Sequence, residues 1–169
     1  MIATIYSYID SPLGQLLVQG DRQFVTGLYM PQHKGWHGPD KSWRRCDEPF
    51  RAVHGQLAQY FAGQRQEFDV PLKLVGTPFQ RRVWRELALI TFGKTITYAE
   101  LAQRIGQPTA SRAVGNANGH NPISILVPCH RVIGASGELT GYAGGIRAKK
   151  WLLELERAAL AEASLPLGG

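Results

Sequence analysis

The residues most able to do chemistry stand together at Cys129, His130 and Arg131, directly after an apolar run that ends in Val127-Pro128. A thiol becomes a strong nucleophile as the thiolate, and nearby basic or cationic groups lower its pKa. His130 could act as a base or relay, and Arg131 would add positive potential. These neighbours predict a reactive cysteine, whereas the apolar context alone is more typical of an inert core residue.

A glutamate in the last predicted helix, residues 147–160, is a candidate partner for this histidine. The buried stripe of the helix consists of Leu152, Leu155 and Ala159. At 100° per residue, Glu156 lies at the edge of the stripe while Glu154 faces the opposite side. A carboxylate directed toward the core needs a partner, which a histidine beside Cys129 would provide. The alternative is an ordinary salt bridge on the helix surface. Residues 161–169 are expected to fray.

Two short amphipathic segments predict a helix-turn-helix ahead of the cysteine. Apolar positions repeat at i, i+3, i+4 and i+7, as Tyr98, Leu101, Ala102 and Ile105 and then as Ala110, Ala113, Val114 and Ala117. The tight break at 106–108 separates the two segments. The outer face of the second helix presents Arg112 and Asn116, with Thr109 and Ser111 beside them. Small residues around one long arginine would let this helix approach a DNA groove closely, although such helix pairs also occur as plain packing motifs.

The N-terminal half predicts an antiparallel sheet with one helix. Strands are expected at 2–9, 16–18 and 24–30, joined by turns at 11–14 and 20–21, with a further strand at 68–72. The helix, over residues 49–62, has the apolar stripe Phe50, Val53, Leu57 and Phe61, and Gly63 can end it. The loop 31–46 carries His33, His37 and Cys46, which lack a fourth ligand for a metal site.

A linker at 73–76 leads to a second helix whose start is well marked. Thr77 is a good N-cap, Pro78 suits the first helical position and Gln80 completes a capping box. The apolar positions of this helix are Phe79, Val83, Leu87 and Ile90, and Gly93 ends the element. After the helix-turn-helix, residues 123–127 are expected to run extended.

The glycine-dense segment 134–145, around Tyr142, predicts either a mobile loop or a wall that allows close approach to a flat ligand. It lacks both the GxGxxG pattern and the lysine of nucleotide-binding loops, so a nucleotide site is rejected.

These elements predict the fold class α/β (α+β). An N-terminal antiparallel β-sheet domain with a helix would occupy residues 1–72. Residues 73–76 would link it to a mostly helical C-terminal domain with a helix-turn-helix, residues 77–169.

Charge and composition favour a soluble protein that meets a polyanion. The net charge is +6, and residues 1–72 carry seven Lys/Arg and seven Asp/Glu, so the excess lies in residues 73–169. No apolar stretch approaches the roughly 20 residues that span a bilayer. The N-terminus has no export pattern, and two distant cysteines do not form a disulfide framework. We therefore expect a reducing cytoplasm and no contact with a membrane.

The C-terminal half resembles the alkylguanine-DNA alkyltransferases, also called methylated-DNA–protein-cysteine methyltransferases, of the bacterial single-function type. The matching motifs are Pro128-Cys129-His130-Arg131, Arg112-Ala113-Val114-Gly115, Asn121-Pro122, Tyr142-Ala143-Gly144-Gly145 and Lys150-Trp151-Leu152-Leu153. This dense match covers residues 77 to 157. The N-terminal half fits more loosely, through Asp10-Ser11-Pro12-Leu13-Gly14 and Tyr60-Phe61-Ala62-Gly63, and the resemblance implies a ribonuclease-H-like sheet there.

The resemblance implies DNA repair by direct damage reversal. The helix-turn-helix would bind duplex DNA through the minor groove, an exception to the usual major-groove docking. The alkylated guanine would rotate out of the stack into a pocket. Cys129 would then take the alkyl group from 6-O-alkylguanine, and by the same chemistry from 4-O-alkylthymine, in a single turnover. No cofactor or metal is implied. The protein would be a monomer in solution, and cooperative binding along DNA is left open.

Residue roles follow from the same resemblance. Cys129 is implied as nucleophile and acceptor, His130 as a base acting through a water, and Glu156 as the group that polarises the histidine. Asn121 would organise the turn beside the active site. Arg112 would enter the stack in place of the flipped base, with Ser111, Thr109 and Asn116 also contacting DNA. Tyr98 would drive rotation of the nucleotide or protonate the leaving guanine. The base pocket would be lined by Tyr98, Val127, Pro128, Tyr142, Ala143 and Gly144.

Two positions depart from some family members. Ala143 stands where some have serine, which removes a side-chain hydroxyl, and Ser124 stands where some have proline, which would widen the pocket. Three rival functions remain. A cysteine hydrolase would need a water route and an oxyanion hole, and the sequence can show neither. A non-catalytic alkyltransferase-like protein would lack the acceptor cysteine, which this chain keeps. A thiol-based redox regulator would need a resolving cysteine, and Cys46 lies in the other half.

Overall fold

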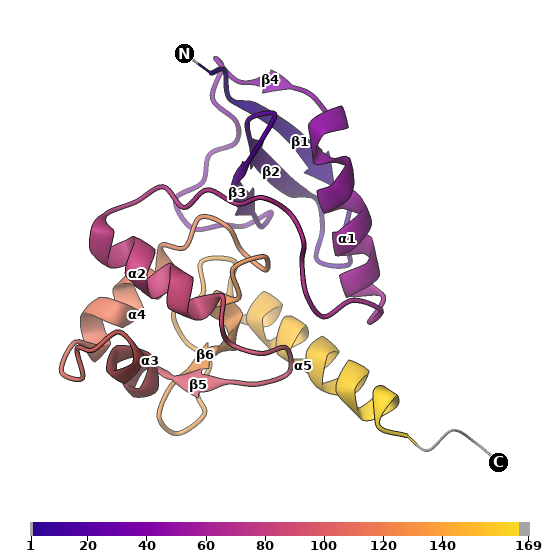
Figure 1. The fold of residues 1–169 in the computed structure, drawn as a ribbon. Helices are drawn as coiled ribbons and strands as arrows, with labels where there is room; N and C mark the ends of the chain where they lie inside the picture. The colour runs from indigo at the N-terminus through magenta and orange to yellow at the C-terminus, as the bar shows by residue number, and fades with distance from the viewer. Residues whose placement is uncertain (1, 166–169) are drawn as a thin grey trace.

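The alternating apolar segments at the start of the chain form a four-stranded sheet (Figure 1). In this computed structural model, which describes residues 2–165, β1 (Ile5–Ile9), β2 (Leu16–Gly20) and β3 (Val25–Tyr29) are antiparallel neighbours, as predicted. The two-residue strand β4 (Arg44–Arg45) adds a parallel pairing to β1 that the sequence did not indicate. Alternate residues of β1 are buried, so one face of the sheet covers the core.

The strand predicted at 68–72 is wrong in extent. Only Leu72 forms an isolated parallel bridge, with Val25. The backbone N–H of Val25 donates to the carbonyl of Pro71 at 2.9 Å, and the N–H of Lys73 donates to the carbonyl of Val25 at 2.9 Å. Pro71 has no N–H to give, so a longer ladder is not available at this position.

A short 3-10 turn, η1 (Glu48–Phe50), leads into α1 (Arg51–Phe61), which lies against the sheet. Val53 and Leu57 are buried as predicted. The fully buried aromatic side chain of this helix is Tyr60, however, and the predicted Phe61 is only half-buried. Tyr60 lies three residues after Leu57, which places both on the same face of the helix.

The helical part begins with α2 (Pro78–Leu87), capped as the sequence predicts. The N–H of Gln80 donates to the Thr77 hydroxyl at 3.1 Å, and the N–H of Thr77 donates to the Gln80 side chain at 3.0 Å. Trp84 on α2 donates its indole N–H to the carbonyl of Ala117 at 2.8 Å. This bond joins α2 to the second helix of the helix-turn-helix.

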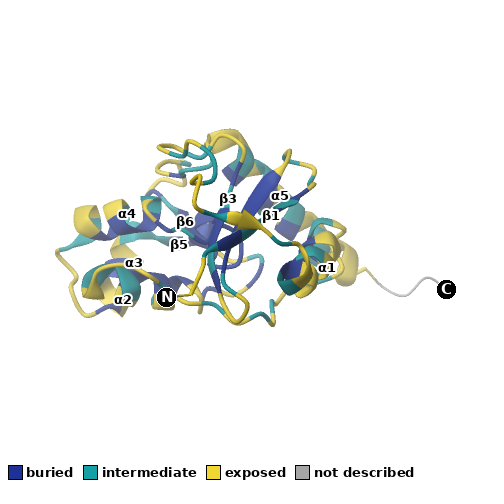
Figure 2. Cartoon of the chain, turned by 90° about the horizontal axis from the view of Figure 1, so that it is seen from above, coloured by how far each residue is buried: buried dark blue, intermediate teal, exposed yellow. Residues whose placement is uncertain are grey.

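The helix-turn-helix consists of α3 (Tyr98–Arg104) and α4 (Ser111–Gly119), in the predicted places. The two-residue strand β5 (Ile96–Thr97) precedes it, and the Thr97 side chain caps α3. The turn contains Gly106 at φ +77°, a conformation that glycine adopts without strain. Ala113, predicted on the apolar stripe, is exposed. In Figure 2 exposed residues mark the outer sides of these helices.

The segment before the cysteine is a tight turn, and the extended run predicted at 123–127 is wrong. Ile125 has φ +71°, which is rare for a β-branched residue. The N–H of Leu28 on β3 donates to the carbonyl of Pro122 at 2.8 Å, and the N–H of Ser124 donates to the carbonyl of Leu28 at 3.1 Å. Hydrogen bonds to β3 of the N-terminal sheet therefore stabilise this turn, and the local sequence alone does not indicate them.

Cys129 opens the 3-10 turn η2 (Cys129–Arg131), which continues into β6 (Val132–Ile133), parallel to β5. The last helix, α5 (Ile146–Ala163), passes below the end of α1 (Figure 1). Residues 161–163 are helical, although fraying was predicted from 161 onward; residues 166–169 lie outside the described residues. Buried side chains from the sheet, α1, α2 and α5 form one continuous core. Within residues 2–165 every helix is too short or too polar to span a bilayer.

Candidate active site

Cys129 lies in the hydrophobic core, with 3% of its surface exposed. Burial raises the pKa of this thiol to about 11, and the Asn121 side chain and the charge of Lys149 offset only part of that rise. The expectation that cationic neighbours lower this pKa below its ordinary value is therefore wrong. At neutral pH the sulfur carries its proton, and that proton must leave before or during any attack.

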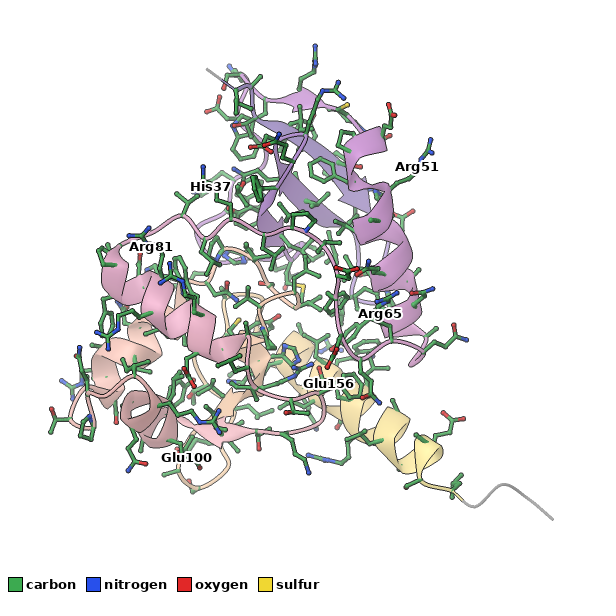
Figure 3. All side chains as sticks on the ribbon, in the orientation of Figure 1. His37, Arg51, Arg65, Arg81, Glu100 and Glu156 are labelled. Atoms are coloured by element: carbon green, nitrogen blue, oxygen red, sulfur yellow. The ribbon has the colours of Figure 1, made fainter. Side chains whose placement is uncertain are left out.

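His130 and Glu156 are both fully buried and paired, with His130 Nε2 2.6 Å from Glu156 Oε2. Burial alone would raise the pKa of Glu156, but the hydrogen bonds and charges of His130 and Arg131 outweigh it and hold that pKa well below its ordinary value. A carboxylate can only accept, so Nε2 of His130 carries the proton that it donates. In Figure 3 the labelled Glu156 extends from α5 toward the middle of the molecule.

The other ring nitrogen of this histidine is free to accept a proton. Among the described residues, Nδ1 of His130 is buried and has no hydrogen-bond partner. Burial lowers the pKa of His130, and Glu156 offsets only part of that effect. The neutral imidazole therefore holds a proton at Nε2 and an open lone pair at Nδ1. This is the state that a base next to a protonated thiol requires.

Arg131 was expected to add positive potential to the thiol, but its guanidinium points to Glu156. Nε donates to Oε1 at 2.9 Å and Nη2 donates to Oε2 at 3.0 Å, which is a bidentate pair. Nη1 donates to the carbonyl of Ile90 at 2.6 Å. The arginine therefore neutralises the carboxylate that orients the histidine.

The positive charge near the sulfur comes from Lys149, which the sequence analysis missed. Its side chain is fully buried, and Nζ donates to the carbonyl of Thr140 at 2.8 Å. Burial lowers the pKa of Lys149 to about 8, and the negative charge of a Cys129 thiolate would raise it. Helical spacing could have indicated this residue, since Lys149 precedes the buried Leu152 by three positions and Glu156 by seven.

Asn121 organises the turn beside the cysteine. Its side chain is buried, Nδ2 donates to the carbonyl of Val127 at 2.8 Å, and Oδ1 accepts from the N–H of Ile123 at 3.0 Å. Tyr98 at the start of α3 is half-buried, and its hydroxyl donates to the carbonyl of Thr140 at 2.9 Å. Thr140 therefore accepts from both Tyr98 and Lys149, so the glycine-dense loop is fastened beside the sulfur.

The residues expected to line a base pocket are buried to different degrees, and two of them line two different cavities. Val127, Pro128 and Tyr142 are buried, whereas Ala143 and Gly144 are half-buried. Gly144 lines a cavity of about 320 Å³ together with Met30 and Trp151, and Pro128 lines a different cavity of about 450 Å³ together with Phe92. Within residues 2–165, the buried hydroxyl of Tyr142 lies near that of Ser124, but neither meets the geometry of a hydrogen bond.

The residues expected to contact DNA lie on the outer side of the helix-turn-helix. Arg112 and Asn116 on α4 are exposed, as is Thr109 before it, and Ser111 is half-buried. As for metals, residues 2–165 contain no group of three or more His, Cys, Asp or Glu side chains that could hold an ion.

Comparison with known proteins places this arrangement in a family. The profile of the 6-O-methylguanine DNA methyltransferase ribonuclease-like domain matches residues 4–74, and that of the DNA binding domain matches residues 78–158. A methylated-DNA–protein-cysteine methyltransferase of Mycobacterium tuberculosis is 52% identical over 154 residues, covering 90% of this chain and 92% of its own length. One from Methanosarcina acetivorans is 50% identical over 152 residues, covering 89% of this chain and 97% of its own length.

A solved structure gives the same result. The crystal structure of Mycobacterium tuberculosis OGT in complex with DNA superposes with a TM-score of 0.87 at 51% identity, covering 92% of this chain and 94% of that one. Fold and sequence thus define a two-domain alkyltransferase with a ribonuclease-like N-terminal domain and a helical DNA-binding domain. The chain belongs to the 6-O-methylguanine DNA methyltransferase family.

Proposed function

We propose that this protein repairs DNA by direct reversal, moving the alkyl group of 6-O-alkylguanine in duplex DNA irreversibly onto the sulfur of Cys129. The observation that carries the proposal is the buried thiol followed by a neutral histidine, whose Nε2 donates to Glu156 and whose Nδ1 is open. Membership of the family and the methyltransferase names of its relatives support the same reaction.

The chemistry follows from the protonation states. His130 Nδ1 takes the thiol proton through a water, Glu156 stabilises the imidazolium that forms, and Lys149 stabilises the thiolate. The sulfur attacks the alkyl carbon, so an S–C bond forms while the C–O bond to guanine breaks. The departing guanine takes a proton from the Tyr98 hydroxyl or from water. The S–C bond of the resulting thioether does not break readily, so each protein molecule reacts once.

Binding of DNA would use the exposed face of α4. Arg112 would enter the stack where the flipped base was, with Ser111, Thr109 and Asn116 beside it. The excess positive charge of residues 73–169 supports attraction to the phosphate backbone. Tyr98, in its proposed role, would rotate the nucleotide, and this requires its bond to the Thr140 carbonyl to break.

The flipped base would lie between Tyr98, Tyr142 and the backbone of Ala143 and Gly144, with Val127 and Pro128 nearby. The open hydroxyls of Tyr142 and Ser124 would then find partners. The hydrogen bonds of Tyr98 and Lys149 to the Thr140 carbonyl hold the glycine-dense loop in place. For the base to enter, this loop would have to move and these bonds would have to break.

The finer parts of the proposal concern scope and organisation. The same attack would remove the alkyl group of 4-O-alkylthymine. The protein would act in the cytoplasm, as a monomer before it meets DNA. Residues 1–72 would form the N-terminal domain, 73–76 the linker and 77–169 the acceptor domain.

The test is restoration of guanine in a defined duplex. An oligonucleotide with one 6-O-methylguanine inside a restriction site is incubated with protein at molar ratios from well below one to above one, and cleavage of the site reports repair. Wild-type protein should restore cleavage in proportion to the amount added, and Cys129→Ala should restore none. Repair by the alanine variant, or many repaired sites per protein molecule, would overturn the proposal.

A further inference from the structure

Tyr60 joins the N-terminal domain to the charged centre of the acceptor domain. Its hydroxyl donates to Glu156 Oε2 at 2.6 Å, across 96 positions of sequence, and both side chains are fully buried. The ring packs against Phe61, Phe68 and Phe92, with centroid distances of 5.5, 5.4 and 6.1 Å. These contacts would hold a phenylalanine equally well, so packing does not explain the hydroxyl.

The carboxylate of Glu156 is saturated with donors. Oε2 accepts from Tyr60, from Nε2 of His130 and from Nη2 of Arg131. Oε1 accepts from Nε of Arg131 and from the N–H of Gly93 at 3.0 Å. A carboxylate offers about four lone-pair sites, so five donors share its charge. Tyr60 and His130 therefore compete for the same oxygen.

We propose that Tyr60 is a positioning residue that sets how strongly Glu156 polarises His130, so that the N-terminal domain tunes the acceptor site. This inference rests on the proposed function, since it concerns the base of that reaction. In this proposal Tyr60 contacts neither the alkylated base nor His130. It acts through Oε2 of Glu156, the oxygen that it shares with His130.

The direction of the effect follows from charge. A donor on Oε2 draws negative charge away from His130, and removing it leaves more charge to stabilise the imidazolium. Burial and the neighbouring Glu156 raise the pKa of Tyr60 well above its ordinary value, so its hydroxyl stays a donor at every working pH. The charged groups that act on His130 are Glu156 and Lys149 on α5 and Arg131 on η2. Tyr60 on α1 and Tyr142 on the glycine-dense loop act on Glu156, and Cys129 precedes His130 in the chain.

The experiment compares wild type with Tyr60→Phe in single-turnover transfer from duplex DNA across pH. Transfer needs neutral His130, so the rate falls on the acid side. In Tyr60→Phe this fall should move to higher pH by roughly half to one unit, which is about a three- to tenfold lower rate at a fixed acid pH. Above the transition the two rates should converge or the variant should be the faster.

A matched control separates tuning from loss of stability. Leu57 is fully buried on the same face of α1, three residues before Tyr60, and makes no hydrogen bond to Glu156. Leu57→Ala should lower the melting temperature and leave the midpoint of the pH profile in place. Replacing Tyr60 by 3-fluorotyrosine, a stronger donor of nearly the same size, should move the midpoint to lower pH.

A second readout does not depend on activity. The ring-nitrogen NMR shifts of His130 in the DNA-free protein report its titration, and Tyr60→Phe should raise the midpoint in the same direction. Equal midpoints in wild type and both Tyr60 variants would overturn the inference. If wild type failed to alkylate Cys129, the proposed function would fail, whereas the NMR titration would still decide the role of Tyr60.

Discussion

Replacing Glu156 with glutamine should break the buried charged centre while the shape of the side chain is kept. The amide nitrogen cannot accept, so at least one of the donors from Tyr60, His130, Arg131 and Gly93 loses its partner. Arg131, a buried residue with 5% of its surface exposed, also loses its counter-ion.

The size of the effect can be worked from these contacts. Removing one partner of a buried ion pair costs about 3–5 kcal/mol, which for a chain of this length lowers the melting temperature by roughly 6–20 °C. The histidine loses the acceptor that fixes its Nε2–H tautomer. Transfer should slow by about 10²- to 10⁴-fold, the usual worth of a positioned general base.

The assay measures melting by calorimetry and single-turnover transfer well below the melting temperature of the variant. Glu154→Gln is the matched control, because Glu154 lies on the same helix, is exposed, and forms a surface ion pair with Lys150 at 3.9 Å. That pair should contribute about 0–1 kcal/mol, with no change in rate. If Glu156→Gln melted and transferred like Glu154→Gln, the charged centre would not hold the fold or the histidine as described.

Further predictions concern Lys149, Arg112 and the pH dependence of stability. Lys149→Met should slow transfer by about tenfold, the rate change of one pKa unit, because the thiolate loses a cation whose charge lowers its pKa. The midpoint of the pH dependence of Cys129 alkylation by a small reagent should then move to higher pH, while Lys150→Met should leave it unchanged. Arg112→Ala should weaken repair in duplex DNA far more than reaction with the free base, and equal losses would count against an intercalating role. The pKa values of Glu156 and His130 both lie below their ordinary values, so each contributes stability that is present above its unfolded value and lost as pH falls. Urea melts should show the free energy of unfolding falling from pH 7 to pH 5 as unfolded histidines gain protons, and His130→Asn should reduce that slope; a flat profile in wild type would contradict buried neutral His130.

Capping patterns and helix periodicity predicted many of the helices, because the residues that define each helix lie close together in sequence. Thr77 and Gln80 cap α2 across three positions, and the apolar repeats of α3 and α4 each lie within eight residues. The inward direction of Glu156 followed from helix periodicity alone, although its complete burial exceeded the predicted edge position.

Contacts between residues far apart in sequence could not be predicted from helix periodicity and capping patterns. Ile125 adopts its left-handed conformation where the adjoining backbone is hydrogen-bonded to β3. The direction of the Arg131 side chain depends on Glu156, 25 positions later, and the bond of Tyr60 to Glu156 was not predicted because the two residues are 96 positions apart. The pKa of Cys129 depends on burial, which residues next to it in sequence cannot report.

In the proposed reaction one sulfur, that of Cys129, keeps the alkyl group. Peptide mass spectrometry after incubation with a duplex containing 6-O-methylguanine can detect that group and locate it. We expect the mass of one added CH₂ group per chain, located on the peptide that contains Cys129 and stable on further incubation. The added mass on Cys46, or repaired guanine with an unmodified Cys129, would contradict the account.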